Sequence, residues 1–236
     1  MKKTAGCLMI CLFVLVGVLS GEEVSQKRFT VKGALAFDSK MTYKVAEAMV
    51  INFSNATYSG TYSEQDNFTF KSTFAFGAEY ALWRKFPWIE TSIGFNFPQK
   101  YSANKLNATM SMPYFGDLRG KADLEDDDFN FLLWSIYSRL RVFFRNVSSE
   151  NVSPYAALKL SSNFVSMEGA IAPSGVSLKN PLGYGVSFGL IFFDNLDVEL
   201  AYDAMHGLIE GVDGVLPEGS NNYDFSSMYV SLGYRI

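Results

Sequence analysis

The chain has 236 residues and a formal net charge of −4, with 16% aromatic and only 19% charged side chains. Removal of an N-terminal leader would take Lys2 and Lys3 with it and leave 18 basic residues against 24 acidic ones. This acidic excess argues against nucleic acid as a partner. The many aromatic rings require either a large core or a surface that uses them.

The N-terminus has the features of a secretory signal peptide. "MKK" precedes the apolar run "TAGCLMICLFVLVGVLSG", which ends in small residues. Residues 1–20 are therefore expected to be a signal peptide cleaved after Ser20, with Gly21 as the alternative, and residues 21–236 the mature domain. A retained membrane anchor is the rival interpretation. Cys7 and Cys11 lie within the apolar run, so the mature chain would have no disulfide, thiolate metal site or cysteine nucleophile.

An alternating pattern recurs along the rest of the chain. In "FTFKSTFAFGAEYALW", residues 68–83, every second residue of one set is large and apolar. A period of two predicts a strand with two unlike faces. Eight such strands are expected, at residues 29–38, 68–83, 88–97, 129–144, 155–164, 182–193, 196–206 and 225–236.

The connections between these strands alternate in length. Those at residues 84–87, 145–154 and 194–195 are short or moderate. The sorting is typical of a membrane barrel with periplasmic turns, extracellular loops and an even number of strands. We therefore expect an all-β, transmembrane eight-stranded antiparallel up-and-down β-barrel. The segment 41–53 is ambiguous, and is interpreted as part of the first loop, either an extension of the wall or a flap. The long loops cover residues 39–67, 98–128, 165–181 and 207–224.

The two strand faces differ in charge. One face is almost purely apolar and should meet lipid, including Phe70, Phe74, Phe76 and Tyr80. A soluble barrel with the faces reversed is the alternative, but glycines on the other face of strand 182–193 suit a crowded interior. The other face carries equal numbers of bases and acids, which should pair inside a narrow lumen because an unpaired buried charge is costly. This expected ion-pair network comprises Lys32, Asp38, Lys71, Glu79, Glu90, Arg139, Arg141, Lys159, Asp197, Glu199, Asp203 and Arg235.

The chain end "MYVSLGYRI" resembles the C-terminal signal that the barrel-assembly machinery of bacterial outer membranes reads. Val230, Leu232, Tyr234 and Ile236 alternate, and Ile236 replaces the usual final aromatic residue. The stretches "WIETSIGFNFP", "SPYAALKLSSNF" and "LGYGVSFGLIFFDNLDVELAYDAM" resemble the small eight-stranded outer-membrane barrels, most of all the outer-membrane protein W type and also the X and A types. The resemblance implies a bacterial outer-membrane location. For the W type it also implies passage of small hydrophobic compounds through a narrow channel with a lateral opening.

Two functions are consistent with these features. The first is a narrow channel for small hydrophobic solutes; the charged lumen departs from the W type and is closer to the plugged X and A types. The second is a structural or adhesive barrel whose four long loops bind a host or matrix ligand. No enzyme is expected, because His206 has no marked serine and carboxylate partners. The acidic loop "DLEDDD", residues 123–128, lacks the glycine spacing of a calcium loop, so neither a metal nor a cofactor is expected.

Overall fold

The computed structural model describes residues 28–53, 56–86, 88–112, 116–145, 152–170, 177–179, 181–210 and 222–236, and the expected signal peptide lies outside them. Every regular element in this part of the chain is a strand. No helix among these residues has the length and apolar character needed to cross a membrane. The strands are β1 (Phe29–Phe53), β2 (Ala56–Phe70), β3 (Thr73–Phe86), β4 (Ile89–Met112), β5 (Gly116–Asp123), β6 (Asn130–Phe143), β7 (Val152–Glu168), β8 (Ser177–Leu178), β9 (Leu182–Phe192), β10 (Leu196–Glu210) and β11 (Asn222–Arg235).

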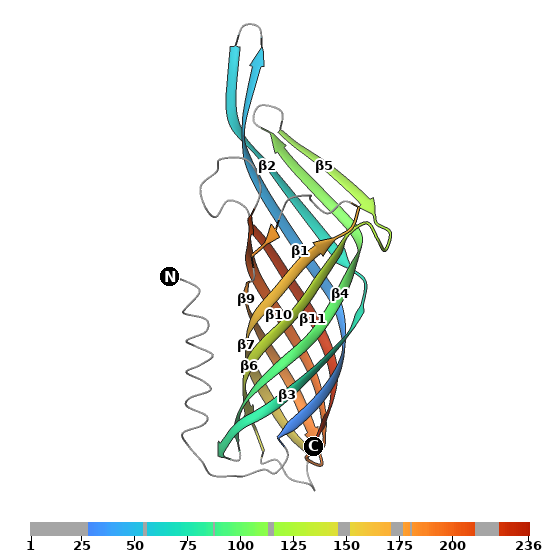
Figure 1. The fold of residues 1–236 in the computed structure, drawn as a ribbon, viewed down its shortest axis with the longest axis vertical. Helices are drawn as coiled ribbons and strands as arrows, with labels where there is room; N and C mark the ends of the chain where they lie inside the picture. The colour runs from blue at the N-terminus through green and yellow to red at the C-terminus, as the bar shows by residue number, and fades with distance from the viewer. Residues whose placement is uncertain are drawn as a thin grey trace.

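Antiparallel pairing closes the sheet into a barrel (Figure 1). The wall has eight positions, occupied in order by β1, β2 with β3, β4, β6, β7, β9, β10 and β11, and β11 pairs back to β1. β2 and β3 share one position: β1 pairs with β3 near its start and with β2 further along. The expected transmembrane eight-stranded antiparallel up-and-down barrel is confirmed.

The two ends of the barrel differ, as the loop lengths predict. We call them the short-turn end and the long-loop end. At the short-turn end, β9 and β10 are joined by the turn at 193–195, one residue longer than expected, where Phe193 and Asp194 take left-handed φ values of 54° and 58°. At the long-loop end, much of the expected loops 39–67 and 98–128 is strand. The segment 41–53 continues β1 and pairs with β2, so it extends the wall and adds no ninth strand.

The extended strands form hairpins that rise beyond the closed barrel (Figure 1). β1 and β2 make one of them. β4 and β5 make the other, across part of the expected loop 98–128. These hairpins project the sheet away from the membrane-spanning wall.

Three neighbouring wall strands each carry an irregularity. β1 bulges at Asp38 and Ser39, the chain leaves regular strand at Lys71 and Ser72, and β4 shifts register at residues 97–98. We call these three sites the bulge line. An extra residue reverses which side chains face inward. Alternation therefore switches phase across this line.

The phase switch corrects one sequence-based expectation. Phe74, Phe76 and Tyr80 face outward as predicted, with exposed fractions of 72%, 63% and 42%. Phe70 was expected on the same outer face but is buried inside the barrel, as is Phe68. The expected strand 68–83 is interrupted at the bulge line, so its apolar residues lie on opposite sides of the wall above and below it.

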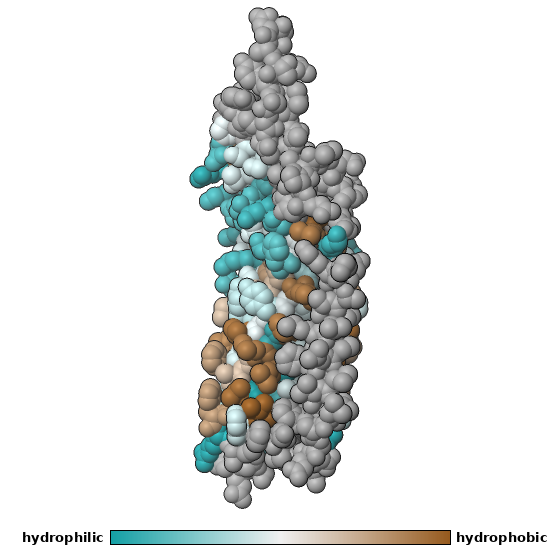
Figure 2. All heavy atoms as spheres, turned by 90° about the vertical axis from the view of Figure 1, so that its left-hand side faces the viewer, coloured by the Kyte–Doolittle hydropathy of each residue, from teal (hydrophilic) through white to brown (hydrophobic). Residues whose placement is uncertain are grey.

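The outer surface below the bulge line is apolar. Exposed residues on this band include Phe188, Leu190 and Leu232, and in Figure 2 the brown side chains gather in one zone with teal side chains beyond them. The inner face is small or charged, as an interior barely wide enough for side chains requires. Gly94 and Gly189 pair across strands with Tyr137 and Tyr155, and a Cβ on either glycine would lie within 2.5 Å of the tyrosine ring.

A cation placed in the apolar band should destabilise the barrel. Phe188 lies in mid-band on β9, between Val186 and Leu190 on the same face. We expect Phe188→Arg to lower the free energy of unfolding in lipid vesicles by about 2–4 kcal/mol, measured by urea titration. Asn107→Arg, on the outward face beyond the band, is the control and should cost about 0–1 kcal/mol. Equal stability of the two variants would contradict the orientation of the wall.

Candidate functional site

The interior next to the short-turn end is a layer of buried charges. It contains four bases and four acids among the described residues, all with exposed fractions of 8% or less. They come from six wall positions, and the remaining two, β7 and β9, contribute Tyr155 and Ser187 as hydrogen-bonding partners. We call this set the charged layer. Its members are Lys32, Glu79, Glu90, Arg139, Arg141, Asp197, Glu199 and Arg235.

Glu79 on β3 lies at the centre of the charged layer. Its carboxylate is 3.0 Å from Lys32 Nζ, 3.3 Å from Arg139 Nη1 and 2.5 Å from Arg141 Nη1. Ser92 donates a further hydrogen bond of 2.7 Å to the same carboxylate. One acid thus meets three cations, each of which contacts other acids in turn.

The remaining acids bridge the other cations. Glu90 lies between Arg141, at 2.5 Å, and Arg235, at 2.7 Å. Asp197 accepts a 3.2 Å hydrogen bond from Arg141, and Glu199 contacts Arg139. Charge-assisted, multiply hydrogen-bonded pairs of this kind offset the large cost of removing ions from water. The layer has no net charge and fills the axis of the barrel.

A small polar chamber lies between the charged layer and the long-loop end. Lys159 on β7 pairs with Asp203 on β10 there. The Tyr101 hydroxyl donates to Gln99 Oε1 at 2.7 Å and lies 2.8 Å from the Tyr229 hydroxyl. Two cavities of about 60 and 20 Å³ adjoin these residues. Each exceeds the roughly 10–15 Å³ that a single water needs, so the chamber can hold water but no larger solute without rearrangement.

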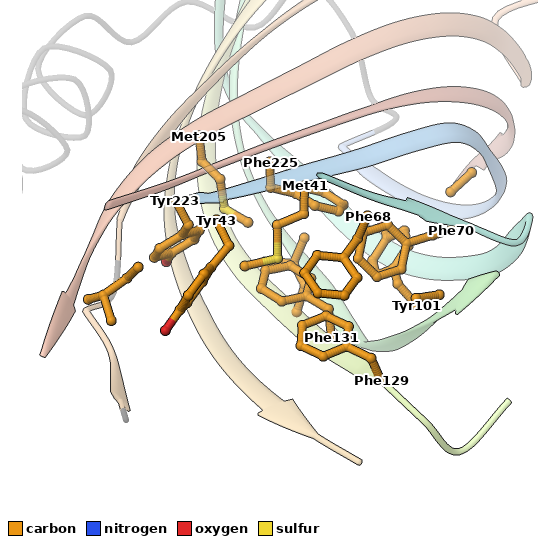
Figure 3. Close-up of a cluster of buried hydrophobic side chains, with 14 of the residues drawn as sticks. Met41, Tyr43, Phe68, Phe70, Tyr101, Phe129, Phe131, Met205, Tyr223 and Phe225 are labelled. Atoms are coloured by element: carbon orange, nitrogen blue, oxygen red, sulfur yellow. The ribbon is translucent and has the colours of Figure 1, made fainter. Parts of the chain in front are cut away.

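Above this chamber the interior is aromatic (Figure 3). Phe68 stacks on Phe129 with ring centroids 4.2 Å apart, and Phe131 stacks on Phe225 at 4.9 Å. The side chains come from β1, β2, β4, β6, β10, β11 and the segment before β6, and they point toward one another in the barrel mouth. We call this set the aromatic cluster. Its large members are Met41, Tyr43, Phe68, Phe70, Tyr101, Phe129, Phe131, Leu133, Met205, Ile209, Tyr223, Phe225 and Tyr229.

The wall is discontinuous beside the chamber. Ladder pairing between β3 and β4 stops at Gly77 and Asn96, and pairing between β2 and β4 starts at Phe70 and Ala103. Between these points Thr73 Oγ1 donates to the Lys100 carbonyl at 3.0 Å, and Lys71 N donates to the Ser102 carbonyl at 2.9 Å. We call this gap, between 73–76 and 97–100, the seam.

The seam adjoins the larger cavity. Ala75, Gly77, Asn96 and Gln99 line the cavity on this side, and Lys159 with Asp203 line it on the opposite side. On the outside, Phe74, Phe76 and Phe97 flank the seam and are exposed. The wall is therefore least closed at a point where apolar residues lie outside and the chamber lies inside.

The structure brings ten of the twelve expected network residues into the interior. Eight form the charged layer, and Lys159 with Asp203 form the pair above it. Asp38 and Lys71 are corrections. Asp38 is exposed and pairs with Lys40 at 2.8 Å, and Lys71 is exposed and pairs with Asp126. Both lie on the bulge line, where the change of phase turns them away from the lumen.

Sequence reasoning missed the aromatic cluster. A signal was present at residues 129–134, where Phe129, Phe131 and Leu133 alternate with a second apolar set, Leu132 and Trp134. A strand that is apolar on both faces indicates lipid on one side and an apolar interior on the other.

The polar residues at the long-loop end form local pairs. His206 Nδ1 lies 2.6 Å from Asp224 Oδ1, and both side chains are exposed on the outer wall. In the acidic loop, the hydrogen bond from Lys71 lowers the pKa of Asp126 below its ordinary value. No group of three or more histidine or acidic residues suited to a metal occurs in the part of the chain that the structure describes.

Asp66 differs from these exposed acids. It lies on β2 beyond the bulge line, paired across strands with Tyr43 and on the same inward face as Glu64. Partial burial, and to a lesser degree the charge of Glu64, raise the pKa of Asp66 to about 6. Its Oδ1 atom is buried and has no hydrogen-bond partner. The ionised form is therefore disfavoured in the folded hairpin.

Comparisons with known proteins identify similar folds only. No family model matches the chain, and no curated protein matches it in sequence. Among solved structures, the outer membrane protein OprG from Pseudomonas aeruginosa is similar with 13% identity, 89% of this chain and 96% of that chain covered, and a TM-score of 0.46. The outer membrane protein AlkL, solved in lipid bilayers, has 12% identity, coverages of 92% and 94%, and a TM-score of 0.44. The outer membrane protease OmpT from Escherichia coli has 9% identity, coverages of 93% and 100%, and a TM-score of 0.42.

Loss of the central acid should unbalance the charged layer. We expect Glu79→Gln to lower the free energy of unfolding by about 3–5 kcal/mol, because three buried cations lose a shared partner. The measurement is urea-induced unfolding in detergent or lipid vesicles. Lys40→Gln, which removes an exposed ion pair, is the control and should stay within about 0.5–1 kcal/mol of the native protein. Equal effects would contradict a tightly coupled interior.

Asp66 should make the protein less stable as pH rises. An acid whose pKa is raised in the folded state binds more protons when folded, so stability falls between about pH 4 and pH 6 and is then constant. We expect the midpoint of urea unfolding to be higher at pH 4 than at pH 7 by a larger margin in the native protein than in Asp66→Asn. An unchanged margin in Asp66→Asn would contradict the raised pKa.

Proposed function

We propose that this chain is a bacterial outer-membrane barrel of the outer-membrane protein W type that passes small apolar molecules from the long-loop side into the surrounding lipid. The expected signal peptide and the apolar outer band support the location. The sorting of turns and loops supports an orientation with the short-turn end in the periplasm. Val230, Leu232, Tyr234 and Ile236, which resemble the assembly signal, are all exposed on the outer face of β11 or at its end.

The single observation that carries this proposal is the seam above a sealed floor. The charged layer occupies the axis, so a solute that enters from the long-loop end has no straight path through. The seam lies above that layer and opens beside Phe74, Phe76 and Phe97 on the lipid-facing side. A lateral exit through the seam would therefore cross the wall where ladder pairing is interrupted.

The aromatic cluster suits the first step of such passage. Phenylalanine rings and methionine side chains accept varied apolar molecules, because their contacts are non-directional and methionine is flexible. The cluster is packed, so an entering molecule must displace rings from one another. Below it, the chamber is too small for a solute in this state, and movement at the seam has to accompany release.

A second function is favoured by a separate observation. The β1–β2 and β4–β5 hairpins extend beyond the barrel, and the interior has little free volume. These features suit a surface barrel whose hairpins and long loops bind a host or matrix ligand. The two proposals differ in one respect: the seam has a role only in passage.

Filling the cavity behind the seam should slow passage. Ala75 is buried and lines this cavity, so Ala75→Leu should lower uptake of an apolar fluorescent probe by cells that carry the barrel by about half or more. Ala78→Leu, on the outer face of the same strand, is the matched control and should leave uptake unchanged. The purified protein should show no steady ion conductance in a planar bilayer.

The outcomes separate the two functions. Uptake equal to that of cells without the barrel would exclude passage and leave surface binding. Uptake that is unaffected by Ala75→Leu would exclude the seam as the route. Steady conductance would contradict the sealed axis.

A further inference from the structure

A sheet of polar side chains covers the outer wall beyond the bulge line. Its middle row runs over six strands in direct register, each residue paired with the next. A similar row lies on each side of the middle row. It is formed by the residues two positions before or after the middle-row residue on each strand. We call the three rows the polar face. The middle row is His206, Asp224, Thr42, Asn67, Asn107 and Lys121.

Alternation along each strand fixes the outward direction of this face. On β1, Met41 and Tyr43 are buried in the aromatic cluster, so Lys40, Thr42 and Lys44 point outward. On β4 a second shift of register at Asn104 changes the alternation again, so Leu106 packs against the aromatic cluster and Lys105, Asn107 and Thr109 point outward. Apart from Leu208 and Ala204 at one side, the side chains are hydroxyl, amide or charged groups.

Amides and hydroxyls dominate the centre of the polar face. Thr42 Oγ1 donates to Asn67 Oδ1 at 3.0 Å, and Gln65 Nε2 donates to the same oxygen at 3.3 Å. Asn107 and Thr109 continue the rows onto β4. Groups of this type retain donors and acceptors for an outside partner rich in hydroxyls.

Three lysines of the polar face lack an ion-pair partner. Lys44, Lys105 and Lys121 form no ion pair with any residue that the structure describes. Lys105 and Lys121 line a hollow of about 360 Å³ together with Asn107 and Asp123. By contrast, Lys40, Lys71 and Lys100, at the edges of the same region, are paired with nearby acids.

The polar face continues directly from the lipid-facing band. On β11 the outward residues run from Leu232 and Val230 through Met228 to Ser226 and Asp224. On β1 they run from Leu35 to Lys40 across the bulge. Where acyl chains contact the band, the headgroups of the same lipids reach the next two rows of side chains, because the hydrocarbon region ends there.

We propose that the polar face binds the headgroups of surrounding lipids that carry both phosphate and sugar hydroxyls. Lysine ammonium groups without acidic partners meet the phosphates, and the amide and hydroxyl rows meet the sugar. Phosphatidylglycerol, with one phosphate and a short polyol, would satisfy only the lysines. The proposal does not depend on what passes through the barrel.

Lipid retention tests this proposal. The purified barrel is placed in nanodiscs that contain phosphatidylcholine with a small fraction of lipid A, dephosphorylated lipid A or phosphatidylglycerol. Lipids retained after extraction into mild detergent are counted by native mass spectrometry. The first variant combines Lys44→Gln, Lys105→Gln and Lys121→Gln, and the second changes the same three lysines to arginine. The control combines Lys71→Gln and Lys100→Gln, which removes charge from lysines that are paired with acids.

We expect the native protein and the arginine variant to retain lipid A. The triple glutamine variant should retain at least about tenfold less lipid A than the native protein. The paired-lysine control should match the native protein. Both dephosphorylated lipid A and phosphatidylglycerol should be retained less than lipid A. A shift between heated and unheated samples on a detergent gel shows that each variant is folded.

Three results would overturn the proposal. The first is equal retention of lipid A by the native and triple glutamine proteins. The second is retention of phosphatidylglycerol equal to that of lipid A, since charge alone would then account for binding. The third is displacement of lipid A by a soluble anionic polysaccharide at lower concentration than by lipid A itself, which would identify a glycan as the partner.

Discussion

The neutral layer of buried charges around Glu79 is the interaction on which the barrel depends. A closed wall of eight positions leaves an interior of about one side chain in radius, and side chains from every wall position meet there. Each ion has lost its water, so the layer is stable only when all partners are present at once. This coupling holds the wall strands at fixed heights. It also closes the axis of the barrel below the chamber.

The bulge line divides the molecule into two parts with different chemistry. Below it, even-numbered residues of β1 and β4, such as Lys32 and Glu90, and odd-numbered residues of β3, such as Glu79, point inward and supply charge. Above it the phase is reversed on β1 and β4, so that Met41, Tyr43 and Tyr101 point inward and supply an apolar interior. Because β2 ends and β3 begins at this line, the wall lacks pairing between β3 and β4 just beside it. The seam is thus a consequence of the same irregularity that changes the interior.

The outside of the barrel follows the same division. The lipid band ends at the bulge line, and the polar face begins there on the strands that continue into the hairpins. On its outer side, each of these strands passes from the lipid band to the polar face. On its inner side, it passes from the charged layer to the aromatic cluster. On β1 an extra residue accompanies this change, because it moves the side chains that follow to the opposite face, whereas β11 makes the same change with unbroken alternation.

Alternation and charge count in the sequence by themselves determined the number of wall strands, the sorting of the connections and the inward position of ten charged residues, because a period of two places side chains on one face without reference to any partner. They could not place Asp38, Lys71 or Phe70, since a bulge has no residue signature as strong as the alternation it interrupts. The aromatic cluster and the seam also required the tertiary structure. Residues far apart in the chain, such as Phe68 and Phe129, come together only when the wall closes, and the absence of pairing between two strands is a property of their register and not of either segment alone.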